Sequence, residues 1–283
     1  MIDIYKIGLH LYNDIDKNSG LHEYNLIKEE IKNIKTIHNI LLILNGKHSE
    51  KDDIALENMW NNYDIHIFIV SDEVALNDEL ANKCDYVLHQ SMRKLPQINK
   101  PQMYSYVPEL FYDNSSKVLD FKDKISKIFF AGGIRDNEEI FEYIENTKLP
   151  TKLLTKSENG LDNRINYKDC QYEMSKYTFA LIVSRKSYQN IGFVTARFAE
   201  AINNSCIPIV LDTYDSDNIW NLHKIKLENI VDFYMDKRSN EQYYYNMLYR
   251  YKYLLSIRRE LFVNQLLQID KTFIGDVNNG NNS

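Results

Sequence analysis

Cysteine is scarce in this sequence, and the three present (Cys84, Cys170 and Cys206) lie far apart. No two of them have CxxC spacing, and none lies near histidines at zinc-ligand spacing. A disulfide framework and a zinc site are therefore not indicated. We expect reduced, mostly buried thiols in a cytoplasmic protein.

Long apolar runs are missing as well. No run approaches the roughly 20 residues that a helix needs to cross a bilayer. The first residues, "MIDIYKIGLHLYND", read as a strand with acidic residues in it and not as a signal peptide. The sequence therefore predicts a protein without a membrane partner.

An excess of positive charge is the third absence, since the formal net charge is −6 and the pI about 5.7. Binding to nucleic acid would have to come from a local cluster such as "MRKLPQINK" (92–100). The composition is 44% hydrophobic and 12% aromatic, which excludes global disorder. A chain of 283 residues has room for two domains.

Short apolar runs alternate with helix-like stretches throughout the first half. The runs predict strands at 3–11, 38–45, 65–71, 86–91 and 103–108. The stretches between them predict helices near 20–34, 53–62 and 75–83. Near-continuous apolar strands separated by helices indicate a parallel sheet covered on both faces.

A second series of the same kind follows. Strands are predicted at 124–133, 151–155, 178–184 and 206–212, with helices near 136–146, 168–176 and 192–204. The fold class is therefore α/β, with two doubly wound, Rossmann-like domains that face a cleft. We expect them at residues 1–115 and 116–240, followed by amphipathic helices over 241–270 that pack back on both and a disordered tail over 271–283.

Ligands of open α/β sheets bind at the carboxyl ends of the strands, so polar residues there are candidates for a site. The strand in "IFFAGGIRDNEE" ends in Gly132 and Gly133, followed by Arg135. Glycines allow close approach of the backbone, and exposed N–H groups with an arginine suit a phosphate. An ordinary turn between a strand and a helix can have the same sequence features.

Arg197 and Glu200 lie three residues apart after another apolar strand, in "GFVTARFAEAINNSCIPIVLD". They are either a surface ion pair or an anion-binding arginine beside a carboxylate that holds a hydroxyl. Together with the glycine pair they favour a nucleotide diphosphate, and we expect Arg197 to point to phosphate and not to Glu200.

Two further strand ends carry weaker signals. Asp72 follows the strand 65–71, where it would serve as a general base or as a helix N-cap. In "KNSGLHEY" the first strand is followed by a Ser-Gly turn with Gly20, and then by His22 and Glu23 at the start of a helix. A loop of this kind can lie over a sugar or a phosphate.

Read in order, these segments resemble the bacteriophage DNA β-glucosyltransferases. The stretch 179–212 is similar to that family's A-L-I-I-x-x-K-x-Y-x-x-x-F-I-T-x-R-x-x-E segment. The matching positions in it are Lys186, Tyr188, Phe193, Thr195, Arg197 and Glu200. The resemblance implies a GT-B-type enzyme that transfers glucose from UDP-glucose to 5-hydroxymethylcytosine in duplex DNA, in the cytoplasm of a phage-infected host cell.

The resemblance also assigns roles to these residues. Arg197 would contact the donor diphosphate and Glu200 the ribose of the donor. "FFAGGIR" is similar to the family's phosphate loop, which places Gly132, Gly133 and Arg135 on the diphosphate.

Two further segments carry catalytic candidates by resemblance. "IFIVSDEVAL" matches the strand whose aspartate is the catalytic base, here Asp72. "YSYVPELFY" matches a segment with an active-site glutamate, for which Glu109 is the candidate.

The sequence departs from the family at two places. Glu138 and Glu139 lie where the family has a second phosphate-loop arginine, and a glutamate of the first loop falls near His22 or Glu23. The sequence thus predicts an inverting glycosyltransferase with a UDP-sugar donor, an Mg²⁺ or Mn²⁺ ion assisting the diphosphate, no protein metal site, and a monomeric state. Its alternatives are a glycan or small-molecule acceptor, or a sugar-nucleotide-binding module without catalysis.

Overall fold

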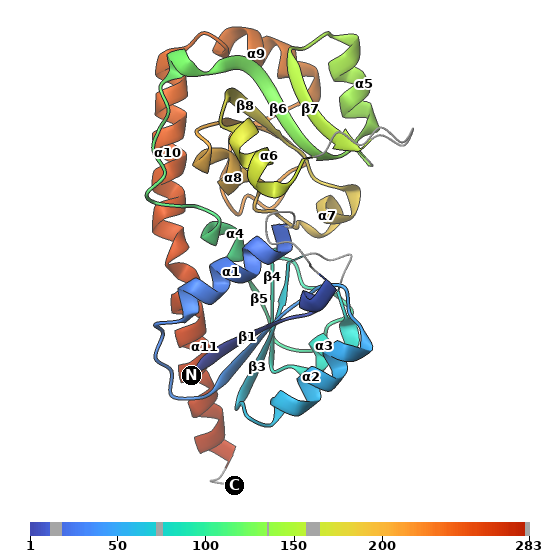
Figure 1. The fold of residues 1–283 in the computed structure, drawn as a ribbon, viewed down its shortest axis with the longest axis vertical. Helices are drawn as coiled ribbons and strands as arrows, with labels where there is room; N and C mark the ends of the chain where they lie inside the picture. Colours follow the sequence, from blue (N-terminus) through green and yellow to red (C-terminus); the bar gives the residue numbers. More distant parts are fainter. Residues whose placement is uncertain (12–18, 72–75, 135, 157–164, 281–283) are drawn as a thin grey trace. The chain divides into compact units, whose positions relative to one another are not determined.

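A computed structural model describes residues 1–11, 19–71, 76–134, 136–156 and 165–280. The chain divides into two compact units, shown in Figure 1. Unit 1 comprises Met1–Leu110 together with Arg258–Ser283, and unit 2 comprises Phe111–Ile257. No helix in the described residues is long and apolar enough to cross a membrane.

Unit 1 contains a five-stranded parallel sheet with helices. Its elements are β1 (Ile2–Lys6), η1 (Leu9–Leu11), α1 (Ser19–Ile31), β2 (Ile40–Leu44), α2 (Glu50–Trp60), β3 (Ile65–Val70), α3 (Asp78–Lys83), β4 (Tyr86–His89), β5 (Gln102–Tyr104), α4 (Val107–Leu110) and, from the end of the chain, α11 (Leu261–Gly280). Every residue of β2 and β3 is buried, which explains why their sequences are apolar apart from His66 in β3.

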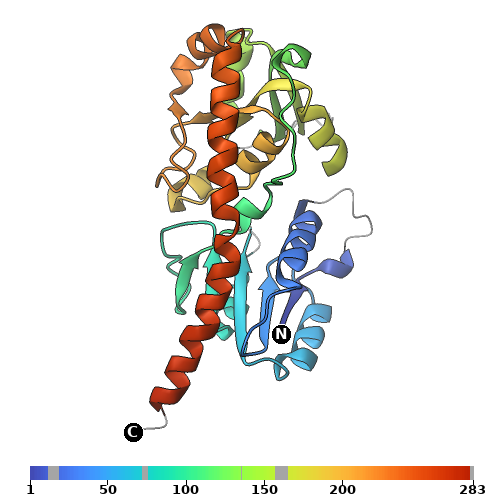
Figure 2. The ribbon, with the colours of Figure 1, turned by 90° about the vertical axis from the view of Figure 1, so that its left-hand side faces the viewer.

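The strands of this sheet follow chain order, β1-β2-β3-β4-β5. Right-handed crossovers in one direction place the connecting helices on one face of the sheet. Figure 2 shows α11 on the face opposite α1 and α2. The side chains of Phe262, Leu266 and Ile269 on α11 are buried at helical spacing, so this helix supplies the missing cover.

Hydrogen bonds from distant parts of unit 1 hold α11 in place. The carboxylate of Asp270 accepts from the backbone N–H groups of Ile37 at 2.9 Å and His38 at 3.0 Å. The amide of Gln265 donates to the backbone carbonyl of Tyr104 at 2.7 Å. The last part of the chain is thus an integral layer of the first sheet.

Unit 2 has its own five-stranded parallel sheet. Its elements are η4 (Phe121–Asp123), β6 (Ile125–Gly133), α5 (Glu138–Asn146), β7 (Thr151–Lys156), α6 (Tyr167–Met174), β8 (Tyr177–Ile182), α7 (Lys186–Ile191), α8 (Arg197–Asn203), β9 (Ile207–Leu211), β10 (Lys224–Ile225), η5 (Leu227–Asn229) and α9 (Ile230–Lys237), with α10 (Glu241–Arg259) running across the division at 257/258.

The strand order of the second sheet is β10-β9-β8-β6-β7. The chain goes from β6 to β7 on one side and then returns to place β8 on the other side of β6. This reversal is a topological switch point, where ligands of open α/β sheets bind at the carboxyl ends of the strands.

The predicted strands are all present, and both sheets are parallel, as the sequence indicated. The helices α7 and α9 and the short strand β10 were not predicted from the sequence. All three cysteines are buried, as predicted.

The domain limits differ from the expected ones at 115/116 and 240/241. Phe111 belongs to unit 2 because its carbonyl accepts a hydrogen bond from the Asn203 amide, whose oxygen accepts from Asp113 N–H at 2.8 Å. The backbone of 271–280 continues α11, where disorder was expected.

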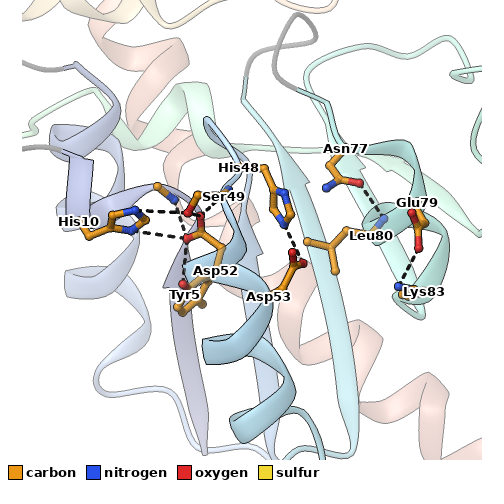
Figure 3. Close-up of polar contacts among 11 residues, drawn as sticks. Tyr5, His10, His48, Ser49, Asp52, Asp53, Asn77, Glu79, Leu80 and Lys83 are labelled. Carbon is orange, nitrogen blue, oxygen red and sulfur yellow. Dashed lines mark hydrogen bonds and ion pairs between the residues drawn. The ribbon is translucent and has the colours of Figure 1, made fainter.

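A buried carboxylate ties the end of β1 to the start of α2 (Figure 3). Asp52 Oδ1 accepts from Gly8 N–H and Tyr5 Oη, each at 2.9 Å, and Oδ2 accepts from Ser49 N–H at 2.9 Å and Ser49 Oγ at 2.7 Å. His10 Nε2 lies 3.3 Å from Ser49 Oγ. Burial alone would raise the pKa of Asp52, but the hydrogen bonds from Gly8, Ser49 and Tyr5 outweigh it and lower that pKa.

We predict that Asp52→Asn lowers the free energy of unfolding by about 2 kcal/mol at neutral pH, because a charged acceptor of four hydrogen bonds is lost. A carboxyl with a lowered pKa stabilises the fold above about pH 5, and the stabilisation fades as the pH falls. Urea unfolding at pH 7 and pH 3 measures both effects.

Asp53→Asn is the matched control. The side chain of Asp53 is 59% exposed and pairs with His48 at 2.9 Å, so its loss should change stability by less than about 0.5 kcal/mol. Equal effects of the two substitutions would contradict the role given to Asp52.

Candidate functional site

The glycine pair and the Arg197 segment follow neighbouring strands. β6, which ends in Gly132 and Gly133, pairs in parallel with β8, with Phe129 opposite Ala180. The carboxyl ends of the two strands therefore meet at the same edge of the sheet, on the two sides of the switch point. Both segments belong to unit 2.

The two glycines differ in what the fold requires of them. Gly132 has a φ of 155°, and a Cβ there would lie 3.2 Å from the ring of Phe130. A Cβ on Gly133 would meet no atom of the described residues within 4 Å. Local geometry therefore explains the first glycine, whereas the second leaves open space at the switch point. Arg135 lies outside the described residues.

The chain after β8 differs from the predicted loop and long helix. Residues 186–191, expected as loop, form α7, and Gly192 ends this helix with a φ of 65°. Left-handed glycine is the common C-cap of a helix. The next helix, α8, therefore begins at Arg197 and not at Gly192.

Arg197 and Glu200 form an ion pair, with Nη1 and Oε2 3.0 Å apart. The prediction that Arg197 points away from Glu200 is wrong for this structure. The Glu200 side chain is only 4% exposed, and a buried carboxylate without a counter-charge would be costly. The charge of Glu200 in turn raises the pKa of Arg197.

Tyr167 completes this arrangement by donating a hydrogen bond to Glu200 Oε1 at 2.9 Å. Burial, and next the charge of Glu200, raise the pKa of Tyr167, so the phenol remains a donor. The Arg197 side chain is 39% exposed, and a guanidinium has five N–H donors. Arg197 can therefore bind an anion without leaving Glu200.

Ser184 is a polar residue at this edge that the sequence did not single out. It follows β8, is 3% exposed, and its hydroxyl has no hydrogen-bond partner among the described residues. Its carbonyl accepts from Gln189 Nε2 at 2.7 Å, which fixes the start of α7. Its position just after an apolar strand was the available signal.

Asp72, the candidate base, lies outside the described residues, but the chain that leads to it is well defined. Ser71 donates from N–H and Oγ to Asn45 Oδ1, at 2.9 and 2.8 Å. Asn45 is buried after β2, and its carbonyl accepts from Lys6 at the end of β1. The ends of three neighbouring strands are thus linked immediately before Asp72.

Glu109 lies in α4 and is fully buried. Its Oε1 is 2.8 Å from Arg258 Nη2 and 3.4 Å from the hydroxyl of Tyr104. Arg258 comes from the end of α10, so this pair joins α4 to the C-terminal helices. No sequence signal linked these two residues.

Gly20, expected in a turn, is the second residue of α1, and His22 lies near the start of that helix, as expected. They belong to unit 1, whereas Gly132, Gly133 and Arg197 belong to unit 2. No group of three or more His, Cys, Asp or Glu that could hold a metal ion occurs among the described residues.

Two units with parallel five-stranded sheets and a switch point at a glycine-rich strand end define a GT-B-like fold. The solved structures similar to this chain include T4 phage beta-glucosyltransferase in complex with UDP and Mn²⁺ (TM-score 0.65, 12% identity) and a mutant of it in complex with UDP-glucose (0.66, 13%). A third is described as the DNA modifying enzyme beta-glucosyltransferase, with and without uridine diphosphoglucose (0.58, 14%).

Each of these alignments covers 96% of this chain and 99% of the other. Likeness at such low identity defines the fold. No protein-family model matches the sequence, and a search of curated proteins gives no match.

We predict that Gly132→Ala and Gly133→Ala have different effects on stability. Gly132→Ala should cost about 2 kcal/mol, because its φ is unfavourable for alanine and Phe130 is close. Gly133→Ala should leave the melting temperature unchanged, because a Cβ fits in open space. Thermal unfolding of both variants measures this, and a large loss for Gly133→Ala would mean that packing selects this glycine.

Proposed function

We propose that the chain is a glycosyltransferase that uses a UDP-sugar and modifies a hydroxymethylated base in DNA. The observation that carries the proposal is the switch point of unit 2. There β6, which ends in Gly132 and Gly133, pairs with β8, the strand that precedes the segment with Arg197 and Glu200. The fold is that of T4 phage beta-glucosyltransferase, which has been solved with UDP and with UDP-glucose.

In the proposed donor site, Gly133 allows the diphosphate to approach the backbone, and Arg197 and Arg135 supply positive charge. As the bond to the sugar breaks, negative charge accumulates on the leaving diphosphate, and a fixed guanidinium stabilises it most in the transition state. Glu200, held by Arg197 and Tyr167, is proposed to accept hydrogen bonds from the ribose hydroxyls of the donor. A divalent cation such as Mg²⁺ or Mn²⁺ would add charge at the diphosphate.

On the acceptor side, Asp72 is proposed as the general base. It takes the proton of the acceptor hydroxyl while that oxygen forms a bond to the anomeric carbon, and UDP leaves with the electron pair of the broken bond. Direct displacement inverts the anomeric configuration. The hydrogen bonds of Ser71 to Asn45 support this role because they fix the backbone next to Asp72.

Glu109 is proposed to position this side of the site. Its burial and its pairing with Arg258 leave the carboxylate engaged with the protein, so α4 and the C-terminal helices are held together. Gly20 and His22 are kept as candidates for contacts with the sugar.

Mass spectrometry of hydroxymethylated duplex DNA incubated with UDP-glucose tests the proposal directly, since transfer adds the mass of one hexose per modified base. Asp72→Asn should lower the turnover at least about a hundredfold because the base is lost, with UDP affinity unchanged.

Asp78→Asn, at the exposed start of α3, is the control and should remain fully active. Unchanged turnover of Asp72→Asn would show that the base is another residue.

The net charge of −6 supports a second candidate, a glycan or small-molecule acceptor. We predict that a DNA acceptor binds with an affinity that falls steeply with salt, because phosphate contacts release counterions. Fluorescence anisotropy of a labelled hydroxymethylated duplex between about 50 and 200 mM salt measures the slope. Absence of binding at low salt would favour the second candidate.

A further inference from the structure

Buried polar side chains are concentrated at the carboxyl ends of β4 and β5. Five residues from these strand ends and from α4 are at most 3% exposed: His89, Gln90, Ser91, Ser105 and Glu109. Burying a polar group is costly unless it is hydrogen-bonded, so each of them requires a partner or a function.

The fold accounts for three of the five. Ser91 Oγ accepts from Arg93 N–H at 3.0 Å, and Ser105 Oγ accepts from Val107 N–H at 3.2 Å, so both serines stabilise turns. Glu109 is paired with Arg258.

His89 and Gln90 are the two that remain, and of these two His89 has a buried side-chain atom without a hydrogen-bond partner among the described residues. It is 2% exposed, and its Nδ1 has no hydrogen-bond partner among the described residues. Burial lowers the pKa of His89 to about 4, although a hydrogen bond with the Gln102 side chain raises it. The ring is therefore neutral at physiological pH, with one nitrogen engaged by Gln102 and Nδ1 unused.

The position of His89 connects it with the proposed acceptor side. It is the last residue of β4, and it pairs in register with Val70 of β3, two residues before Asp72. Its other neighbour is Tyr104 of β5. The unused nitrogen thus belongs to the strand end next to the one that leads to the proposed base.

The chemistry of this nitrogen limits its partner. A neutral, buried imidazole pairs best with an uncharged donor or acceptor, such as an amine, a carbonyl or a hydroxyl, whereas a phosphate would require a cation. Arg258, the cation bound to Glu109 of this cluster, is already paired. The polar edge of a heterocyclic base meets these requirements.

We propose that His89 Nδ1 hydrogen-bonds the acceptor base and determines its recognition, an inference that rests on the proposed glycosyl transfer to DNA. The partner reaches Nδ1 when the acceptor displaces the protein atoms that cover it. In this proposal the bound acceptor uses the nitrogen for which the described part of the chain supplies no partner.

Two substitutions distinguish the roles of the two ring nitrogens of His89. The amide of His89→Asn occupies the place of Nδ1. The amide of His89→Gln occupies the place of Nε2 and preserves the hydrogen bond with Gln102. We expect His89→Gln to raise the KM for a hydroxymethylated duplex about tenfold, because one hydrogen bond to the base is lost. The KM of His89→Asn for the same duplex should stay near that of the wild type. The kcat and the KM for UDP-glucose should not change in either variant.

His66 provides the control for a purely structural histidine. It is also buried and lies at the opposite end of β3, but its ring stacks on Trp60 at 3.9 Å, and its nitrogens lie 3.0 Å from Trp60 O and 3.4 Å from Asp85 Oδ2. His66→Gln should lower the melting temperature and leave the KM for the duplex unchanged.

A spectroscopic test does not depend on variants that fold. The ¹⁵N resonance of His89 Nδ1 should shift when the wild-type protein binds the hydroxymethylated duplex, and the resonances of His66 should not. Equal KM values for His89→Asn and His89→Gln, or an unmoved Nδ1 resonance in a protein that transfers the sugar, would overturn the inference alone. A wild type that transfers no sugar to DNA would overturn the proposed function and this inference with it.

Discussion

The reversal of strand order at β6 is the constraint on which the proposed donor site depends. β6 has β7 on one side and β8 on the other, so the segments after β6 and β8 leave the same edge of the sheet in different directions. A ligand at that edge is contacted by the glycines of one segment and by the helix that follows the other. The first sheet runs in chain order without a reversal, and there the strand ends are instead linked by side chains, such as Asn45, that bond to neighbouring strands.

The strands were predictable because parallel strands buried on both faces are nearly continuous apolar runs, as in β2, β3 and β8. Helix limits were less predictable. The sequence around Gly192 suits the start of a helix as well as the end of one, and the left-handed φ of this glycine decided for the end of α7. The candidate site depended on the two strand ends, which the sequence identified, and on their adjacency, which only the strand order establishes.

Two buried carboxylates show why part of the site was visible in the sequence and part was not. Glu200 and its partner Arg197 are three residues apart on one helix, so the pairing was one of two readings of the sequence. Glu109 is paired with Arg258, from a helix that begins more than a hundred residues later. Tertiary pairing over such a separation leaves no local pattern in the sequence. The same holds for His89, because only the structure shows that its Nδ1 is buried without a partner among the described residues.

The layered construction of unit 1 has a consequence for how the protein is made. One face of its sheet is covered by α11, while the strands of that sheet all come from the first 104 residues. A ribosome synthesises the whole of unit 2 before it reaches α11. The sheet of unit 1 therefore emerges with one apolar face exposed until α11 has been synthesised. Nascent chains of this protein therefore pass through a stage in which unit 2 is complete and unit 1 is open, exposed to chaperones and to proteases until synthesis reaches α11.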